Sequence, residues 1–469
     1  MNKYFDVHNH LFNKHFLGKE LLYRMMKELR KFIDLQKDRS LDRRPDRGLK
    51  KVIATLKIYK NAIRVFTKKN SIAIYEELDK TYKGEFILTP LTFDLTYCFA
   101  PTADRDLPAG SQEIINDAIN DEMEVLFDMV ESQTRSMSRV FNPFAESEED
   151  KLWNEFLEEK EQFLKIAEEF QQSDEIPETD GTRGIFKKRG PSDGWNEQLR
   201  QIEELKTHPV YKDMVYPFLA IDPRRPGIAE YAKANVGKGK MFAGVKLYCP
   251  NGYSPTDPLL FGSEGNRDGI YAFCEDNGIP VTVHNSDGGF ATLAKSVVIN
   301  GLIQVNGKLI QLNNELLKFS KGITEKDAIY ERALSINHPL IWGKVAEKYP
   351  NMLLNLAHFG GGRQLEAAMD HPDNLNLWSN RIIELLKDDR YKVYTDVSCF
   401  SEFSAIDKLI ASPVYQKIKS RILYGSDYTL LLLFEDNFDE NVRQFRTKFG
   451  SDFDIIAREN PMEFLKNII

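Results

Sequence analysis

Short apolar or β-branched runs recur along the chain, and each is closed by Gly, Pro, Asn or Asp before a stretch with helical spacing. This alternation predicts βα units built around a parallel sheet, the α/β class. Several runs are apolar throughout, as expected for strands that are covered on both faces. The predicted strands are Tyr4–His10, Phe86–Phe93, Val215–Ile221, Gly244–Tyr248, Pro280–His284, Met352–His358, Lys392–Val397 and Arg421–Ser426. Eight such strands indicate a closed (β/α)8 barrel of the TIM type.

Two insertions are predicted between these strands. A barrel of this type needs about 250 residues, so a chain of 469 residues can form a single domain, 1–469, with long βα loops. Between the second and third strands, 111–206 has apolar residues at three- and four-residue steps, which predicts a mostly helical insertion. After the fifth strand, Asn306-Gly307 separates two apolar runs and predicts a β-hairpin. Because active sites of these barrels lie where the βα loops emerge, we expect both insertions to border a substrate.

Composition narrows the choice of partner. The formal net charge is -8, which disfavours nucleic acid and anionic membranes and favours a small-molecule substrate. The start of the chain has no apolar run typical of a signal peptide, so we expect a cytoplasmic protein. The four cysteines form no CxxC pair, which argues against a disulfide framework and a thiolate zinc site. The sequence leaves open whether the protein forms a homo-oligomer.

Two histidines close the first predicted strand. His8 and His10 are two residues apart, so on a strand both imidazoles project from one face. If that face is the barrel interior, the pair forms half of a metal site. Asp6 shares the face one step deeper and could orient a ligand imidazole.

Further polar residues follow the carboxyl ends of other strands. His284 ends the fifth strand, His358 ends the sixth and precedes three glycines, and Asp427 follows the eighth. The carboxyl ends of barrel strands converge, so these side chains are expected to meet His8 and His10. Imidazole and carboxylate groups are ligands for Zn²⁺, and Mn²⁺ or Fe²⁺ is the alternative.

Taken together in chain order, these motifs resemble the amidohydrolase superfamily, in the branch of metal-dependent hydrolases that also includes decarboxylases. The resemblance rests on Asp6-Val7-His8-Asn9-His10, Gly244-Val245-Lys246-Leu247, Val281-Thr282-Val283-His284, His358-Phe359-Gly360-Gly361, Gly425-Ser426-Asp427-Tyr428 and Glu459-Asn460-Pro461, and on the stretch from Asn337-His338-Pro339 to Lys348-Tyr349-Pro350. It extends from Tyr4 to Pro461, and the insertion 111–206 lies outside it.

The resemblance implies roles for individual residues. His8, His10, His284 and Asp427 would bind the metal, and Asp427 would also move a proton. His358 would be a second-metal ligand or a catalytic acid or base beside a single metal. Three or four protein ligands leave a coordination position for water, whose pKa the cation lowers.

Lys246 has three interpretations. In binuclear relatives a lysine at this place is carboxylated and bridges two metals. An unmodified Lys246 could bind a substrate carboxylate or stabilise developing negative charge, or it could extend outward from the end of the strand. The branch resembled here favours one metal.

Lesser candidates surround the same barrel mouth. Arg105, Arg224, Arg225 and Arg363 follow strand ends, where guanidinium groups would suit a carboxylate-bearing substrate. The remaining histidines, His15, His208, His338 and His371, lack strand-end placement and are interpreted as structural.

Three functions are compatible with these residues. The first is hydrolysis of an amide, lactone or ester bond of a small, carboxylate-bearing substrate through a metal-activated water. The second is non-oxidative decarboxylation on the same barrel, with His358 or Asp427 protonating carbon. The third is a metal-binding protein without activity, which a site of this kind disfavours because a purely structural zinc is closed by four ligands.

Overall fold

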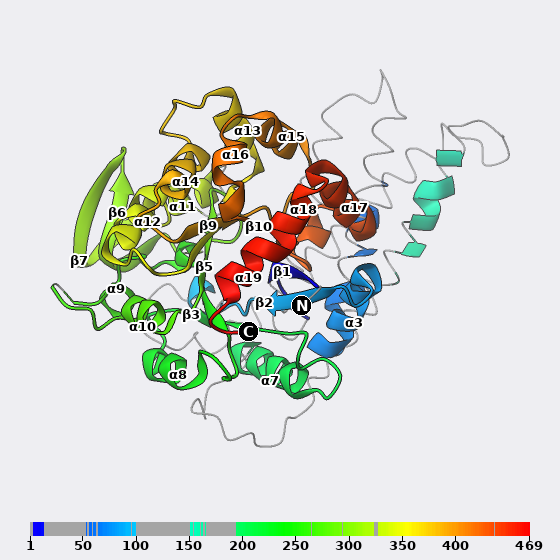
Figure 1. The fold of residues 1–469 in the computed structure, drawn as a ribbon, viewed down its shortest axis with the longest axis horizontal. Helices are drawn as coiled ribbons and strands as arrows, with labels where there is room; N and C mark the ends of the chain where they lie inside the picture. The colour runs from blue at the N-terminus through cyan, green and yellow to red at the C-terminus, as the bar shows by residue number, and fades with distance from the viewer. Residues whose placement is uncertain are drawn as a thin grey trace.

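The computed structural model describes residues 3–13, most of 53–99, several positions between 151 and 165, and 194–469 except for 264, 293, 323–326 and 436. Within these ranges, eight parallel strands lie at the centre of the molecule and helices surround them (Figure 1). The strands are β1 (Tyr4–Asn9), β2 (Phe86–Pro90), β3 (Phe218–Ile221), β4 (Gly244–Leu247), β5 (Val281–Ser286), β8 (Leu354–Gly360), β9 (Val393–Asp396) and β10 (Ile422–Leu423). All eight predicted strands are therefore confirmed.

Hydrogen bonds close these strands into a barrel. Six strands form one sheet in the order β10-β9-β8-β5-β4-β3, and β1 pairs with β2 in parallel. Parallel bridges from Leu88 to Val215 and from Leu91 to Phe218 join β2 to the β3 side. The amide of Val7 donates to the carbonyl of Tyr424, 3.1 Å away, and joins β1 to the β10 end. The chain thus forms the predicted α/β fold, a (β/α)8 barrel.

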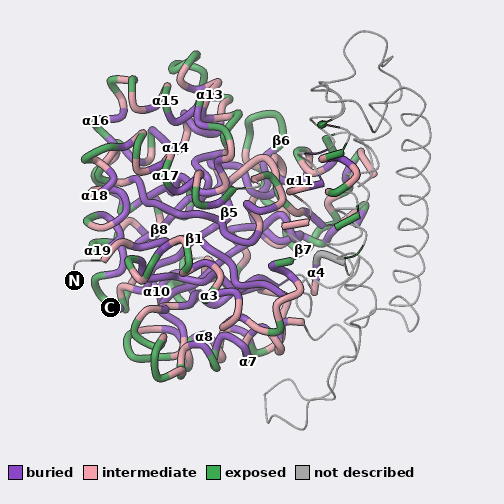
Figure 2. The backbone as a smooth tube through the Cα atoms, turned by 90° about the vertical axis from the view of Figure 1, so that its right-hand side faces the viewer, coloured by how far each residue is buried: buried purple, intermediate pink, exposed green. Residues whose placement is uncertain are grey.

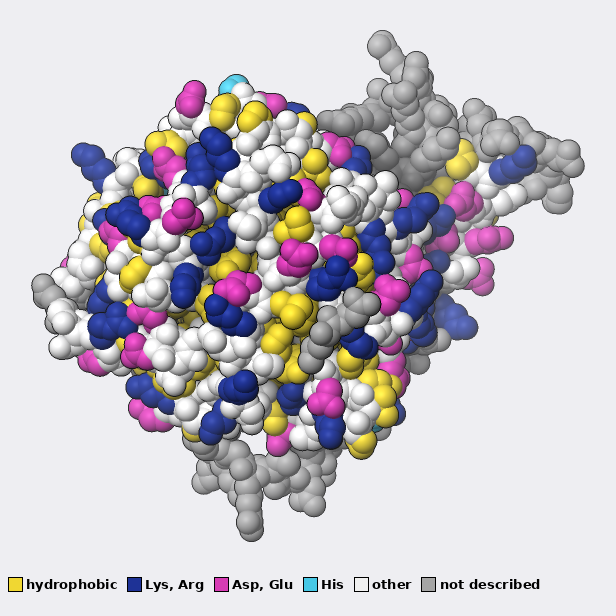
Figure 3. Space-filling model, viewed as in Figure 1, with side chains coloured by type: hydrophobic (Ala, Val, Ile, Leu, Met, Phe, Trp, Pro, Cys, Tyr) yellow, Lys and Arg dark blue, Asp and Glu magenta, His cyan; other side chains and the backbone are white. Residues whose placement is uncertain are grey.

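Helices lie between and after the strands. They are α3 (Ser71–Tyr82), α4 (Thr96–Phe99), α7 (Gly194–Thr207), α8 (Ile228–Asn235), α9 (Pro258–Phe261), α10 (Ile270–Asn277), α11 (Ala328–Ile336), α12 (Pro339–Lys348), α13 (Gly362–Asp370), α14 (Trp378–Lys387), α15 (Ser404–Ala411), α16 (Tyr415–Ile418), α17 (Phe438–Phe449), α18 (Asp452–Asp454) and α19 (Asn460–Leu465), with a π-helical turn at Ile455–Glu459. Buried residues fill the centre of the molecule, and exposed residues lie on the outer helices and loops (Figure 2). On the face shown in Figure 3, basic and acidic side chains are interspersed.

Helix α3 illustrates how the sequence places such an element. The side chain of Asn70 accepts a hydrogen bond from the amide of Ala73 and caps the first turn. The helix ends at Lys83, whose left-handed backbone (φ 52°) stops the helical repeat. Its buried residues recur every three or four positions, and they are Ser71, Ile74, Tyr75, Leu78 and Tyr82. This stripe packs α3 on the outside of β1 and β2 and brings the hydroxyl of Tyr82 to Asp6.

The hairpin predicted after the fifth strand is present and longer than expected. β6 (Ser296–Val305) and β7 (Lys308–Lys318) are antiparallel, and Val305 pairs with Lys308 across the turn. Asn306 and Gly307 both have positive φ, as the tight two-residue turn requires. The hairpin packs on the segment after β4, where the hydroxyl of Ser254 donates to the carbonyl of Leu302 at 2.8 Å. It therefore lies on the carboxyl-end side of the barrel, where the βα loops emerge.

Most of the predicted insertion 111–206 lies outside the described residues, as do Arg105 and His15. Its final part is described as α7, and the described positions between 151 and 165 are helical as well. The side chain of Gln198 in α7 accepts a hydrogen bond from the amide of Phe93, just after β2. The chain thus returns from this segment directly onto the barrel. Among the described residues, no helix combines the length and apolar character needed to cross a membrane.

Candidate active site

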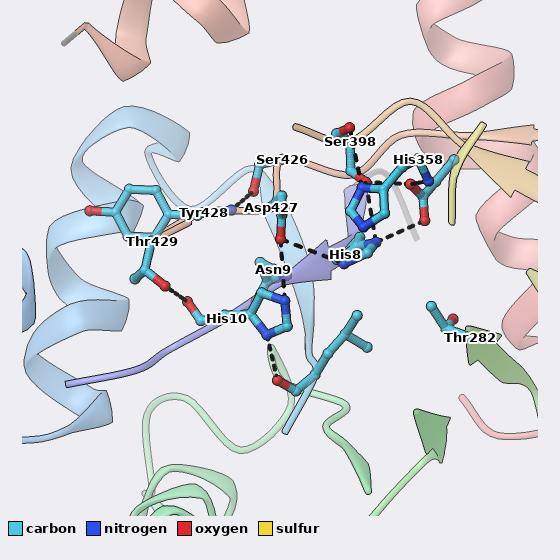
Figure 4. Close-up of polar contacts among 12 residues, drawn as sticks. His8, Asn9, His10, Thr282, His358, Ser398, Ser426, Asp427, Tyr428 and Thr429 are labelled. Atoms are coloured by element: carbon cyan, nitrogen blue, oxygen red, sulfur yellow. Dashed lines mark hydrogen bonds and ion pairs between the residues drawn. The ribbon is translucent and has the colours of Figure 1, made fainter. Parts of the chain in front are cut away.

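Side chains from the carboxyl ends of several strands meet inside the barrel mouth (Figure 4). His8 and His10 come from the end of β1, His358 from β8, and Asp427 from the segment after β10. The imidazole rings lie close together: the ring centroids of His8 and His10 are 5.5 Å apart, and those of His8 and His358 are 4.6 Å apart. All four residues are buried. The structure thus brings together the four residues predicted from these three strand ends.

The two histidines of β1 are each held through Nδ1. Nδ1 of His8 lies 3.0 Å from Oδ2 of Asp396, and Nδ1 of His10 lies 2.8 Å from the carbonyl oxygen of Leu91. A carboxylate or carbonyl can only accept, so in neutral imidazoles the ring proton sits on Nδ1 of both histidines. Both Nε2 atoms then carry a lone pair directed into the site. This is the arrangement in which proteins present histidine to a metal ion.

Asp427 faces these two lone pairs. Its Oδ1 lies 3.2 Å from Nε2 of His10 and 3.6 Å from Nε2 of His8, yet it accepts no hydrogen bond from any described residue. Gly425, two residues earlier, permits this approach, because a Cβ there would lie 2.5 Å from Cβ of His8. When both rings carry their proton on Nδ1, this carboxylate oxygen and the two Nε2 atoms converge with no hydrogen between them, and a cation satisfies such a set.

The charges of the buried groups lead to the same conclusion. Burial, and then the nearby ammonium of Lys246, lower the pKa of His8 to about 3, so this imidazole is neutral at pH 7. Burial also lowers the pKa of His358. For Asp427, burial opposes ionisation, whereas a hydrogen bond from His10 and a proton carried by His8 or His358 lower its pKa below the ordinary value. When these rings are neutral, no proton compensates the buried carboxylate, and a positive ion can take that role.

Lys246 and His284 complete the predicted set. Nζ of Lys246 lies 3.4 Å from Nε2 of His8, so the lysine points inward, and burial lowers its pKa to about 8. The ring of His284 lies 4.7 Å from that of His358 and stacks on Tyr248. Nε2 of His284, however, is 2.9 Å from the carbonyl oxygen of Gly288. The ligand atoms that lie within 4.8 Å of one another belong to His8, His358 and Asp427.

The segments after the strands adopt strained backbone conformations at this site. Several of the non-glycine residues with left-handed φ lie here, namely His358 (φ 68°), Phe359 (φ 52°), Cys399 (φ 62°), Asp427 (φ 57°) and Thr429 (φ 68°). Such conformations cost free energy in ordinary residues and concentrate where a side chain must be aimed at a particular point.

The sequence model of the amidohydrolase family matches residues 188–465, which is more than half of the chain. The chain belongs to the amidohydrolase family. The match covers β3 to β10 and includes Lys246, His284, His358 and Asp427, whereas His8 and His10 precede it. Members of this superfamily act as metal-dependent hydrolases or decarboxylases, and the residues described above fit a divalent cation.

Solved structures of similar proteins are distant from this amidohydrolase. An amidohydrolase from Burkholderia multivorans is 12% identical and aligns over 58% of this chain and 80% of its own, with a TM-score of 0.36. The Metarhizium anisopliae IDCase is 13% identical over 58% of this chain and 68% of its own, with a TM-score of 0.31. Dihydroorotase from Saccharomyces cerevisiae is 11% identical over 57% of this chain and 72% of its own, with a TM-score of 0.27. No curated protein sequence matches the chain.

One expectation about this amidohydrolase has to be corrected. Asp6 does not orient an imidazole: its carboxylate accepts hydrogen bonds from the amide and hydroxyl of Ser426, at 2.9 and 2.6 Å, and from the hydroxyl of Tyr82. It therefore fixes the segment that carries Asp427. Asp396 at the end of β9 holds the ring of His8 instead. Asp6 and His8 are two residues apart on β1 and share a face, but the carboxylate of Asp6 lies deeper and reaches Ser426, after β10, rather than an imidazole ring.

Asp6 predicts a measurable pH dependence of stability. Burial raises its pKa from 3.8 to about 6, so on raising the pH the unfolded chain loses this proton before the folded protein does. Protonation of Asp6 therefore contributes about 3 kcal/mol to the free energy of unfolding below pH 4. This contribution is lost as the pH rises through 6. Urea unfolding of metal-free protein should therefore show the wild type losing about 3 kcal/mol relative to Asp6→Asn between pH 4 and pH 8. A difference that stays constant with pH would contradict this account of Asp6.

Asp396 and Ser398 were missed by the sequence analysis. Both are buried, and the hydroxyl of Ser398 lies 2.8 Å from Nδ1 of His358. The seventh predicted strand, Lys392–Val397, contains Asp396 next to its last residue and is followed by Ser398, and these polar residues at a strand end were the available signal.

Two of the four arginines suggested for a substrate carboxylate are already engaged by acids. Arg224 donates two hydrogen bonds to Asp222, at 2.8 and 2.6 Å, and Arg225 donates two to Asp94, at 2.6 and 2.9 Å. Their charges are thus compensated within the protein. The structural interpretation of His338 is supported, because its ring accepts a hydrogen bond from the amide of Leu340 at the start of α12.

Proposed function

We propose that this amidohydrolase hydrolyses an amide, lactone or ester bond of a small, carboxylate-bearing molecule with the help of a divalent cation. The proposed ligands are His8, His10, His284 and Asp427, and zinc is the proposed metal, with manganese or iron as alternatives. The observation that carries this proposal is the buried Oδ1 of Asp427, which faces Nε2 of His8 and His10 without a hydrogen bond from any described residue. A zinc ion held by such ligands polarises a carbonyl group and lowers the pKa of water to about 7.

The chain's own residues supply proton transfer and charge stabilisation. In the proposed mechanism Asp427 accepts a proton from the attacking water and returns it to the leaving group. Lys246 is buried beside His8, and its ammonium can stabilise the negative charge that develops on the substrate oxygen or bind the substrate carboxylate. The pairing of Arg224 and Arg225 with acids favours Lys246 for the second task.

Non-oxidative decarboxylation is the alternative on the same site. It is favoured by His358, whose Nδ1 is engaged by Ser398 and whose ring lies between those of His8 and His284. A histidine so placed could deliver a proton to carbon.

We also propose that 111–206 and the β6–β7 hairpin are parts of one barrel domain and border the substrate. The support is the hairpin's contact with the segment after β4, on the side of the barrel where the candidate ligands lie.

Product analysis separates the two reactions. Zinc-loaded protein would be incubated in ¹⁸O-labelled water with carboxylate-bearing amides, lactones, esters and aromatic or unsaturated acids. We expect one ¹⁸O atom in the acid product and no CO₂. Release of CO₂ without incorporation of ¹⁸O would contradict hydrolysis and support decarboxylation.

A further inference from the structure

The carboxylate of Asp396 lies between two histidines of the site. Its Oδ2 is 3.0 Å from Nδ1 of His8, and the side-chain amide of Asn355 donates to the same oxygen at 2.7 Å. Its Oδ1 accepts the backbone amide of His358 at 2.9 Å and the hydroxyl of Ser398. Asp396 is fully buried. One carboxylate therefore contacts the ring of one histidine and the backbone of another.

Ser398 extends this arrangement to the second ring. Its hydroxyl has a single proton, which it donates to Oδ1 of Asp396. Towards Nδ1 of His358, 2.8 Å away, the same oxygen can then only accept. The proton of the His358 ring consequently sits on Nδ1, and its Nε2 carries a lone pair.

The same reasoning applies to His8, since Oδ2 of Asp396 can only accept the Nδ1 proton. Both rings thus have one tautomer with an unprotonated Nε2, and one ligand atom from each of His8, His358 and Asp427 lies within 4.8 Å of the others.

We propose that Asp396 is a positioning residue that fixes the tautomers of His8 and His358 together, directly and through Ser398, so that His8 presents Nε2 to the cation and His358 keeps an unprotonated Nε2 beside it. This rests on the proposed function in so far as the cation is the metal of that site. The tautomers themselves are a property of the metal-free protein and can be tested separately.

An asparagine at this position cannot replace the carboxylate. Four donors converge on two oxygens, and in Asp396→Asn an NH₂ group takes the place of one oxygen. Either His8 or the pair formed by Ser398 and the His358 amide would then face a donor instead of an acceptor. Removing such a partner of a metal-binding histidine weakens metal affinity by roughly 10- to 100-fold.

Asp222→Asn is a matched control for this variant. Asp222 is also a buried aspartate at the end of a barrel strand, since it directly follows β3. Its carboxylate accepts hydrogen bonds from the backbone amide and the guanidinium group of Arg224 rather than from a histidine. Its replacement should leave both the tautomers and the metal affinity unchanged.

The experiment uses full-length protein in two states. In metal-free protein, ¹⁵N-histidine NMR reports which ring nitrogen is protonated. We expect Nδ1–H in His8 and His358 of the wild type and of Asp222→Asn, and loss of this form in at least one ring of Asp396→Asn. In the second state, competition with a chromophoric chelator measures Zn²⁺ affinity, and we expect Asp396→Asn to bind roughly 10- to 100-fold more weakly than the wild type and Asp222→Asn.

The outcomes are distinguishable. If wild-type protein binds no Zn²⁺, the proposed function fails, whereas the tautomers in metal-free protein still decide the role of Asp396. Unchanged tautomers in Asp396→Asn, or Zn²⁺ affinity equal to that of the wild type, would overturn the proposal. If Asp396→Asn does not fold, Ser398→Ala replaces it. The Nδ1–H form of His358 should then decrease, because only the carbonyl of residue 398, 3.4 Å from Nδ1, remains to accept the proton, while the tautomer of His8 is kept. An undiminished Nδ1–H form at His358 would overturn the proposal as well.

Discussion

An Asp427→Asn variant is expected to lose turnover by a factor of about 10² or more while keeping its bound cation. The side chain keeps its size and one oxygen that can face His8 and His10. It loses the basicity of a carboxylate whose pKa is held below the ordinary value by its imidazole neighbours. Since a general base contributes about 10² to 10⁴ in rate, the defect should appear in the rate constant of the chemical step.

Turnover and metal content should be measured on the same Asp427→Asn preparation once a substrate is known. Asp287→Asn is a suitable control, because Asp287 also follows a barrel strand and accepts a hydrogen bond from Gln364, which an asparagine oxygen can still accept. Near-normal turnover in Asp427→Asn would mean that His358 or another group moves the proton.

The second large effect is expected for the histidines. His8→Ala and His284→Ala should each remove most of the bound metal and leave the fold intact, because the surrounding barrel core is mainly apolar. Metal content by mass spectrometry and circular dichroism of the same samples check both parts. Unchanged metal content in both variants would contradict the proposed site.

His358→Ala adds a comparison that the geometry suggests. In the structure Nε2 of His284 contacts the carbonyl of Gly288. His358 instead has a ligand atom within 4.8 Å of ligand atoms of His8 and Asp427. If His284 is the ligand, its variant loses more metal than His358→Ala. The reverse order would assign the cation to His358 instead. His371→Ala, at an exposed position, should retain the metal of the wild type.

The barrel could be predicted from sequence because each strand is an apolar run ended by a turn residue. The predicted start of the third strand is less accurate. Val215 forms only a single bridge, to Leu88, and the strand itself begins at Phe218, after Pro217. The hairpin was predictable because Asn306-Gly307 suits one turn type.

The candidate ligands were predictable for a related reason, namely that strand ends converge in this fold. Their partners were not. Asp6 and Asp396 both sit on strands, and only the depth of each side chain in the barrel decides that Asp396 reaches His8 and Asp6 reaches Ser426. The pairing of Arg225 with Asp94 joins positions more than a hundred residues apart, which no local pattern indicates.

Metal analysis of wild-type protein purified without chelator tests the central claim most directly. The account predicts roughly one divalent cation per chain, lost on dialysis against a strong chelator and regained when Zn²⁺ is added. Protein that contains no metal as purified, and that binds no Zn²⁺, Mn²⁺ or Fe²⁺ when these are supplied, would contradict the metal site formed by His8, His10, His284 and Asp427.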